Sequence, residues 1–405
     1  MTLPSMTAQP MTASMPLPDN RLAVYFHIPF CRTRCTYCAF NTYTGQSERI
    51  APYMHALQCE MHHVIGCSNH IIIDSIYLGG GTPSLVPVAE IAAVLDTCAD
   101  VFTIAPEIEI TLEANPGTVD QTYLRELQLA GINRLSIGMQ SANTSELRLF
   151  GRRHYVDDVR WTADRARAVG INNISLDLIY GIPRQTLAMW RYSLDTAIKM
   201  APNHLSLYSL GIEEATPMQR RIAHRELPQP NPDLAADMYE WASDRLSAAG
   251  FEQYEISNWA QPGFACRHNV HVWRNLPYLG LGAGAHGYAA QTRYANVCLP
   301  ATYIERILSQ QSPLPFPLSA AAEEVEHIDE RNAMAETMIL GLRLVGEGVS
   351  LNAFRARFGV DLWTVYGAQL DRLIKVGLVE IISGARVRLT RRGRLLGNRV
   401  FMEFV

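Results

Sequence analysis

The chain has 405 residues, 48% of them hydrophobic, so its length allows one large domain with a sizeable core and a second, smaller domain. Its net charge of −4 argues against wholesale nucleic-acid binding, which favours basic domains. No uninterrupted apolar run reaches the ~18 residues that span a bilayer, so we expect no transmembrane segment.

Residues 1–20 are rich in Met, Thr, Pro and Ser, which is typical of a disordered extension. They contain neither the charged region nor the apolar region of a secretory signal peptide. We therefore expect a cytoplasmic protein, in which structural disulfides are rare.

From residue 22 onward, apolar strands alternate with amphipathic helices. The expected strands cover 22–28, 71–78, 107–113, 134–140, 173–179 and 204–210. The expected helices lie near 48–65, 87–99, 120–130, 155–169 and 186–200. Strands that alternate with helices predict an α/β fold with a parallel sheet. Six such units predict an open, partial (β/α)6 barrel, with its site at the carboxyl ends of the strands.

The pattern changes after about residue 325. Acidic residues cluster at 323–330, and expected helices at 331–344, 350–358 and 362–376 precede a strand pair near 378–389 and a last helix. This order resembles a winged-helix unit. We expect an N-terminal extension at 1–20, a main domain at 21–325 and a C-terminal winged-helix-like domain at 326–405.

Six arginines lie between residues 386 and 399. They could form a nucleic-acid surface, or a basic face that is solvated or docks onto the acidic main domain. The acidic balance of the whole chain favours the second interpretation, and no nucleic-acid partner is expected.

Three cysteines, Cys31, Cys35 and Cys38, follow the first expected strand with CxxxCxxC spacing. Soft thiolates select zinc, copper(I) or iron–sulfur clusters. A structural zinc site usually closes with four ligands, whereas three cysteines on a [4Fe–4S] cluster leave one iron open to a small ligand. An iron–sulfur cluster is therefore the favoured interpretation, ahead of zinc, a disulfide or inert thiols. The scattered cysteines are interpreted as small buried hydrophobes: Cys59, Cys67, Cys98, Cys266 and Cys298.

Polar and glycine-rich segments follow the later strands. Gly79–Pro83 (GGGTP) closes the second one, where glycines let the backbone approach a ligand closely; a tight turn is the alternative. Glu113, Gln140 and Asp177 lie at or near three successive strand ends and could accept from ribose hydroxyls or an ammonium group. Arg152 adds a cation suited to a carboxylate. Strand-end capping or a surface ion pair is the alternative for each.

A series of motifs covers nearly the whole chain, in this order: YFHIPFCRTRCTYCAFN, YLGGGTPSL, ITLEANPGT, INRLSIGMQS, LFGRRH, ISLDLIYGIPRQT, YEISNWA, CRHNVHVW and YLGLGAGAH. The chain thereby resembles the radical S-adenosylmethionine (SAM) superfamily and, within it, coproporphyrinogen III oxidase-like proteins. The resemblance implies a [4Fe–4S] cluster on Cys31, Cys35 and Cys38. It also implies a SAM site formed by Tyr25, Tyr37, Gly80, Gly81, Thr82, Glu113, Gln140, Arg152 and Asp177.

Phe40 separates two branches of this group. The oxygen-independent oxidases carry a CxxxCxxCxC loop, whereas Phe40 stands at the place of the fourth cysteine and resembles the HemW-type heme chaperone branch. The resemblance implies a protein that binds heme and hands it to acceptor hemoproteins. The alternative is an oxidase that decarboxylates coproporphyrinogen III, an activity that Phe40 argues against. A zinc-bound structural protein with a DNA-binding winged helix is a remote third hypothesis.

The same branch has an HNxxYW motif that is interpreted as part of heme binding. This chain has His268, Asn269, His271 and Trp273 there, with Val272 in place of the tyrosine. A neutral imidazole can ligate heme iron, and a tryptophan can stack on a porphyrin. The alternative is a structural turn with a hydrogen-bonded histidine and a core tryptophan.

Overall fold

The computed structural model describes residues 20–65, 71–383 and 385–405; the expected disordered extension falls almost entirely outside these residues. Six parallel strands lie side by side in chain order and confirm the predicted α/β partial barrel. They are β1 (Arg21–Ile28), β4 (Ile72–Gly80), β5 (Thr103–Ala114), β6 (Arg134–Gln140), β7 (Asn173–Tyr180) and β8 (His204–Ser209).

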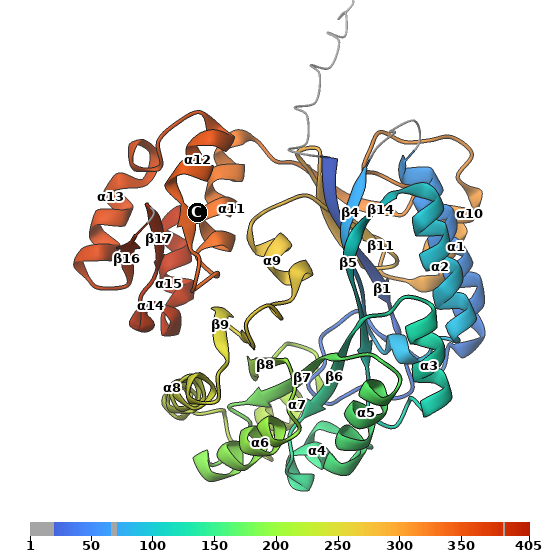
Figure 1. The fold of residues 1–405 in the computed structure, drawn as a ribbon, viewed down its shortest axis with the longest axis horizontal. Helices are drawn as coiled ribbons and strands as arrows, with labels where there is room; N and C mark the ends of the chain where they lie inside the picture. Colours follow the sequence, from blue (N-terminus) through green and yellow to red (C-terminus); the bar gives the residue numbers. More distant parts are fainter. Residues whose placement is uncertain (1–19, 66–70, 384) are drawn as a thin grey trace, which may run out of the picture.

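Helices cover the outer, convex face of these strands (Figure 1). They are α1 (Ile50–Ile65), α2 (Val88–Val101), α3 (Gln121–Leu129), α4 (Thr144–Phe150), α5 (Val156–Ala168) and α6 (Leu187–Lys199). Two short 3-10 helices, η2 (Ser47–Arg49) and η3 (Pro83–Leu85), lie in the connections. The short helix α4 was not predicted, because seven residues are too few to display a helical period.

β11 adds a further parallel strand beside β1, and antiparallel strands extend the sheet beyond β11 and β8. The whole sheet has the order β14-β13-β12-β11-β1-β4-β5-β6-β7-β8-β10-β9. No helix or strand was predicted between residues 211 and 322. The additional elements are α7 (Pro217–Ala223), α8 (Pro232–Ala248), β9 (Glu252–Glu255), β10 (Asn258–Ala260), α9 (Arg267–Trp273), β11 (Tyr278–Leu281), β12 (His286–Ala289), β13 (Thr292–Asn296), α10 (Pro300–Ser309) and β14 (Ala322–His327). The acidic stretch at 323–330 thus contributes most of the exposed edge strand β14.

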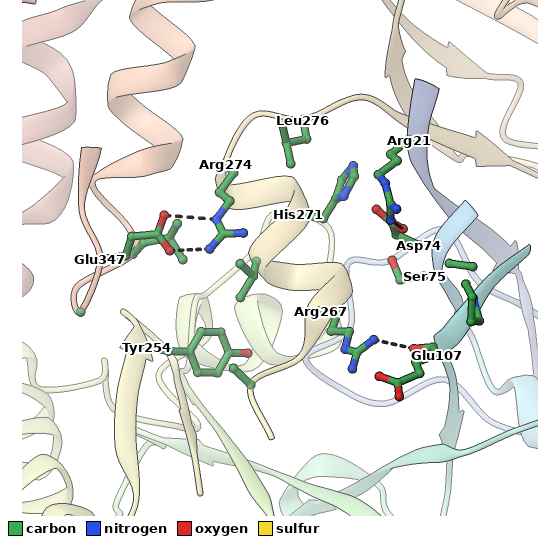
Figure 2. A pocket seen from close by; sticks show the side chains of 16 residues that line it. Arg21, Asp74, Ser75, Glu107, Tyr254, Arg267, His271, Arg274, Leu276 and Glu347 are labelled. Carbon is green, nitrogen blue, oxygen red and sulfur yellow. Dashed lines mark hydrogen bonds and ion pairs between the residues drawn. The ribbon is translucent and has the colours of Figure 1, made fainter. Parts of the chain in front are cut away.

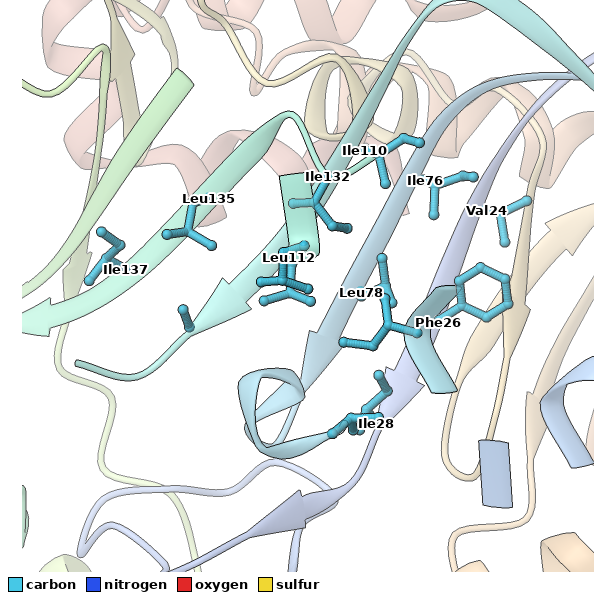
Figure 3. Close-up of a cluster of buried hydrophobic side chains, with 14 of the residues drawn as sticks. Val24, Phe26, Ile28, Ile76, Leu78, Ile110, Leu112, Ile132, Leu135 and Ile137 are labelled. Carbon is cyan, nitrogen blue, oxygen red and sulfur yellow. The ribbon is translucent and has the colours of Figure 1, made fainter. Parts of the chain in front are cut away.

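Side chains alternate between the two faces of each strand, so that apolar side chains pack in the core beneath the helices and polar side chains line the inner face of the barrel. In β1, Val24, Phe26 and Ile28 are fully buried in the apolar core, where they lie beside side chains of β4, β5 and β6 (Figure 3). Successive side chains of a strand point to opposite faces, so Tyr25 and His27 face the inside of the barrel. The registers Tyr25↔Tyr77, Glu113↔Ser136 and Asp177↔Ser206 place further polar side chains on that inner face.

A buried carboxylate joins α1 to the late strands of the sheet. Glu60 is fully buried and accepts hydrogen bonds from the Gly282 N–H (2.8 Å), Asn296 Nδ2 (2.9 Å), the Tyr303 hydroxyl (2.6 Å) and the Ser319 hydroxyl (2.8 Å). Four donors offset the cost of burying the carboxylate, so Glu60 fixes the β11–α10 region against the barrel.

The C-terminal elements pack around a core of their own, which includes Phe354, Leu370 and Val387. They are α11 (Glu330–Gly341), β15 (Val349–Ser350), α12 (Leu351–Phe358), α13 (Leu362–Lys375), β16 (Val379–Ile382), β17 (Arg386–Leu389), α14 (Arg391–Leu395), α15 (Gly397–Phe401) and η4 (Met402–Phe404). Arg391 forms two hydrogen bonds with Asp244 of α8, at 2.8 and 2.9 Å. This member of the arginine cluster therefore docks onto the main domain.

The cysteines outside the triplet only partly follow expectation. Cys98 and Cys266 are buried, Cys59 is half-buried, and Cys298 is exposed, which makes the prediction wrong for Cys298; Cys67 lies outside the described residues. Cys298 is exposed because it lies in the loop between β13 and α10, at the molecular surface.

Within residues 20–65, 71–383 and 385–405, no helix is long and apolar enough to cross a membrane.

Candidate functional site

The cysteine loop follows β1 and begins with β2 (Phe30–Cys31), which pairs in parallel with β3 (Tyr43–Thr44). Thr36 anchors the middle of the loop: its N–H donates to the Phe150 carbonyl (3.0 Å) and its hydroxyl to the Leu149 carbonyl (2.8 Å). The Met218 N–H donates in turn to the Thr36 carbonyl (2.8 Å). Contacts with α4 and α7 therefore fix the loop at the carboxyl ends of the strands.

Cys31, Cys35 and Cys38 are free, half-buried thiols that line one cavity of about 360 Å³. Burial raises the pKa of the Cys31 and Cys35 thiols, and the nearby Arg152 guanidinium opposes that shift by favouring the thiolates. Among the described residues, no three His, Cys, Asp or Glu side chains converge as ligands of a single metal ion. The ligands of a cubane bind three different irons and so need not converge on one point.

The GGGTP segment lies directly against the cysteine loop. The Gly81 N–H donates to the Ile28 carbonyl and the Thr82 N–H to the Phe30 carbonyl, both at 2.8 Å. A Cβ on Gly81 would lie 2.7 Å from the Phe30 carbonyl oxygen, so this approach requires glycine. Gly80 has φ of +112°, and its N–H donates to Glu113. Because these three N–H groups are bonded, the segment offers a ligand carbonyl oxygens and the Thr82 hydroxyl.

Two half-buried carboxylates lie beneath this segment. Glu113 accepts from the Tyr77 hydroxyl (2.9 Å) and the Gly80 N–H (3.1 Å), and Asp177 accepts from the Ser136 hydroxyl (3.0 Å). Burial, together with the charge of Asp177, raises the pKa of Glu113 to about 7. Burial also raises the pKa of Asp177. Such carboxylates can accept hydrogen bonds from hydroxyl or ammonium groups of a ligand.

Arg152 connects the far wall of the cavity to the cysteine loop. Its guanidinium donates to the Tyr37 hydroxyl (2.9 Å) and to Asn115 Oδ1. Asn115 Nδ2 donates in turn to the Thr82 hydroxyl (3.2 Å), which lies 3.5 Å from the Cys31 sulfur. A chain of polar contacts therefore joins a fixed cation to the GGGTP segment and the first cysteine.

Most of the predicted SAM-site residues line this one cavity: Tyr37, Gly80, Gly81, Thr82, Glu113, Gln140, Arg152 and Asp177. Gln140 ends β6 with φ of +62°, which folds its side chain back over Gly138. Tyr25 does not line the cavity: its hydroxyl bonds to His27 Nδ1 (2.9 Å), and its ring packs on Tyr77.

Tyr77, Asn115 and Ser136 are among the side chains of the cavity that were not singled out from the sequence. Each orients a predicted residue: Tyr77 bonds to Glu113, Asn115 to Arg152, and Ser136 to Asp177. Strand parity could have identified Tyr77 and Ser136, because they share the inner face with Tyr25 and Glu113.

The expected heme-binding residues lie on α9, at the other end of the barrel (Figure 1). His268 is buried; its Nδ1 bonds to the Ser75 hydroxyl (3.2 Å), and its ring packs on Tyr25 and Tyr77. Trp273 is covered by the Arg343 guanidinium, 4.2 Å from the ring centroid.

The other two candidates on α9 differ in their surroundings. Asn269 Nδ2 donates to the Tyr254 hydroxyl at 3.4 Å, whereas His271 lines a second cavity. Of the four candidates on α9, His271 is thus the one that borders a cavity large enough for a ligand.

Comparison with known sequences places two family models on the chain. The model of the Radical SAM superfamily matches residues 25–197, and that of the HemN C-terminal domain matches residues 328–396. The first covers the cysteine loop and β1 to α6, and the second covers most of the C-terminal unit.

Full-length relatives are also found. "Heme chaperone HemW" of Bacillus subtilis is 36% identical over 384 residues, covering 95% of this chain and 99% of the relative. "Radical S-adenosyl methionine domain-containing protein 1, mitochondrial" of Mus musculus is 39% identical over 372 residues, covering 89% and 82%. The solved structure of coproporphyrinogen III oxidase (HemN) from Escherichia coli superposes with a TM-score of 0.81 at 23% identity, covering 96% of this chain and 90% of the oxidase, so the two share the fold.

Proposed function

The chain belongs to the HemW family of the radical SAM superfamily, and from this premise we propose that it is a heme chaperone, which binds heme and delivers it to acceptor hemoproteins. Relatives that carry the name heme chaperone HemW match over 95% of the chain at 36% identity. Because the match covers the barrel and the C-terminal unit alike, it supports a shared activity of the whole protein.

Phe40 is the single observation that carries the choice between chaperone and oxidase. It lies two residues after Cys38, lines the cysteine cavity and leaves 68% of its side chain exposed. A phenyl ring there cannot act as the thiolate that the oxidase loop carries at this position. The likeness to the Escherichia coli oxidase is at 23% identity and supports the fold alone.

Membership in the radical SAM superfamily implies a [4Fe–4S] cluster and SAM, and the cysteine cavity fits both. Cys31, Cys35 and Cys38 would hold three irons of the cluster. The carbonyls of the Gly80–Thr82 segment, together with the half-buried Glu113 and Asp177, suit the ammonium and ribose groups of SAM. When bound, the reduced cluster would supply an electron to SAM; this chain's own residues orient the ligand and exclude water.

We further propose a cytoplasmic location. All seven cysteines in the described part of the chain are free. Cys298 is exposed and the three cluster cysteines are half-buried, so these four thiols are accessible to solvent. Free, accessible thiols are typical of a reducing compartment.

The test is anaerobic reconstitution followed by two parallel assays. Wild type should bind heme saturably and should not convert coproporphyrinogen III to protoporphyrinogen in the presence of SAM and a reductant. The Escherichia coli oxidase serves as the positive control for conversion. Absence of saturable heme binding, or turnover comparable with that of the control, would refute the chaperone proposal.

A further inference from the structure

Hydrogen-bonded side chains inside the barrel connect the cysteine cavity with the second cavity, which His271 borders. The second cavity has a volume of about 790 Å³ and lies between α9, the amino ends of β1 and β4, and the C-terminal unit (Figure 2). Tyr254 of β9 lines this second cavity, whereas Asp177 of β7 lines the cysteine cavity. A path from Asp177 to Tyr254 therefore crosses the inside of the barrel.

Two side chains bridge the distance between Asp177 and Tyr254. The Ser175 hydroxyl donates to Asp177 Oδ1 at 3.3 Å and lies 2.8 Å from His204 Nδ1. On the other side of the imidazole ring, His204 Nε2 lies 2.9 Å from the Tyr254 hydroxyl. Ser175 and His204 are buried, so bulk water does not compete for these hydrogen bonds. The path thus consists of three consecutive hydrogen bonds.

An ionised Asp177 sets one direction of donation along the whole path. A carboxylate only accepts hydrogen bonds, so Ser175 donates its single proton to Asp177 and accepts from His204 Nδ1–H. Burial lowers the pKa of His204 well below its usual range, so the ring is neutral and Nε2 keeps a lone pair. Nε2 therefore accepts from the Tyr254 hydroxyl, and the Tyr254 oxygen accepts from Asn269 Nδ2 at 3.4 Å.

A protonated Asp177 reverses this direction. Its carboxyl group donates to Ser175, Ser175 donates to His204 Nδ1, and the Nε2–H group donates to the Tyr254 oxygen. The proton of the Tyr254 hydroxyl is then available to the second cavity. Burial raises the pKa of Asp177, which brings the protonated form closer to neutral pH. The protonation of Asp177 thereby determines which ring nitrogen of His204 carries the proton.

We propose that Ser175, His204 and Tyr254 form a proton relay between Asp177 and the second cavity. As Asp177 gives up its proton to Ser175, Ser175 passes its own proton to His204 Nδ1. His204 passes the Nε2 proton to Tyr254, and Tyr254 releases its hydroxyl proton to water in the second cavity. One proton enters the relay, one leaves it, and no electrons are transferred.

The relay goes beyond the proposed chaperone function. It gives Asp177 a route for its proton while the cysteine cavity is filled. Ser175, His204 and Tyr254 do not line the cysteine cavity, so they are positioning residues that act on a ligand there only through Asp177.

Other ionisable groups lie near the two ends of the relay. Those that face Asp177 come from four neighbouring strands: Tyr77 of β4, Glu113 of β5, Arg134 of β6 and Tyr208 of β8. Arg134 also faces His204, and Cys266 and Glu255 face Tyr254. Within the described part of the chain, no other side chain forms a hydrogen bond with Ser175 or His204, so the relay has no branch between its ends.

The first experiment determines the tautomer of His204 by 15N nuclear magnetic resonance of the full-length, histidine-labelled protein, with His204→Gln assigning the signal. At the alkaline end of the pH range in which the protein stays folded, wild type should carry the ring proton on Nδ1. In Asp177→Ala the proton should shift to Nε2, because the Ser175 hydroxyl loses its carboxylate acceptor and donates to the ring instead.

Ser136→Ala is the matched control, because it removes a hydrogen bond to Asp177 that lies outside the relay. It should keep the proton on Nδ1, and circular dichroism reports that each variant is folded. A proton that stays on Nδ1 in folded Asp177→Ala, or that moves to Nε2 in Ser136→Ala, would overturn the relay.

The second experiment tests the exit to the second cavity by measuring exchange of the His204 ring proton with water. Ser175→Ala disconnects Asp177 and leaves Tyr254 as the one partner of the ring. Adding Tyr254→Phe should slow the exchange at least about ten-fold, because exchange then requires a local opening of the structure. Adding Tyr25→Phe instead is the control, since it removes a tyrosine–histidine hydrogen bond elsewhere in the barrel and should leave the rate unchanged.

Equal exchange rates in folded Ser175→Ala and folded Ser175→Ala/Tyr254→Phe would overturn the exit through Tyr254. Neither experiment uses SAM or heme. Their failure would therefore leave the proposed function standing, and absence of heme binding by wild type would leave the relay standing.

Discussion

Gly81 of the GGGTP segment lies against the Phe30 backbone of the cysteine loop. Adding a side chain at this position tests whether the segment must lie so close to the loop for SAM to bind. In Gly81→Ala the new methyl group would lie 2.7 Å from the Phe30 carbonyl oxygen and 2.9 Å from the Phe30 nitrogen. The first distance is about 0.7 Å short of the 3.4 Å at which ordinary contact begins. Backbone atoms surround the site, so the strain cannot be relieved by rotating a side chain.

The strain acts on two backbone hydrogen bonds that hold the segment to the cysteine loop. They run from Gly81 to Ile28 and from Thr82 to Phe30, both at 2.8 Å. A typical net contribution is about 0.5–1.5 kcal/mol each, so weakening both costs about 1–3 kcal/mol. If this cost is carried in full into SAM binding, the affinity for SAM falls about 5- to 150-fold.

The assay is isothermal titration of SAM into the anaerobically reconstituted protein, with iron content measured in parallel. Gly346→Ala is the matched control, because its Cβ would meet only the Gln253 carbonyl, at an ordinary 3.6 Å. It should bind SAM as wild type does. Wild-type SAM affinity and iron content in Gly81→Ala would refute the reasoning.

Three further predictions concern the same cavity. The triple Ala variant of Cys31, Cys35 and Cys38 should lose its iron and the charge-transfer absorption at about 400 nm; retention of iron would contradict the cluster assignment. Asp177→Ala removes a charge-assisted acceptor, typically about 1.5–3 kcal/mol, so SAM affinity should fall at least several-fold in titration calorimetry, whereas unchanged affinity would count against this wall of the site. Glu113 should make the SAM-free protein less stable as pH rises: its pKa is raised from 4.5 to about 7, so the folded state keeps a proton that the unfolded chain has lost between these values. Glu113→Gln should lessen that slope in thermal unfolding measured across pH, while Glu60, Asp177 and the other carboxyls with raised pKa values keep their share of it. The exposed control Glu126→Gln should leave the slope unchanged, and identical slopes in wild type and Glu113→Gln would refute the shift.

The barrel could be predicted because its signals are local. Each of the six parallel strands contains closely spaced apolar residues within six to twelve positions, and the predicted and observed strands overlap along most of their length. Glu113 and Asp177 could be placed in one site because parallel strands bring their carboxyl ends together.

The rest depends on contacts between distant parts of the chain. His268 meets Ser75 across 193 residues of sequence, and no local pattern shows that its ring enters the barrel. The short strands β9 to β13 have three to five residues each, too few for a clear period, and β11 pairs with β1 only because the chain returns to the first edge. Asn115 joins the site by hydrogen bonds to Thr82 and Arg152. Its role therefore depends on the relative positions of three loops, which the sequence alone does not reveal.

The buried Glu60 has a consequence for the order in which the protein can be completed during synthesis. Its four donors lie 222 to 259 residues later in the chain. A ribosome that adds about 5–20 residues per second reaches Ser319 about 13 to 50 seconds after Glu60. Before the first of these donors is made, α1 cannot close onto its final neighbours without burying an unpaired carboxylate, and the full set of donors is complete only with Ser319. The first half of the barrel is therefore kept from premature closure until the last strands arrive, and a nascent chain stalled before residue 319 should remain open to proteolysis along α1.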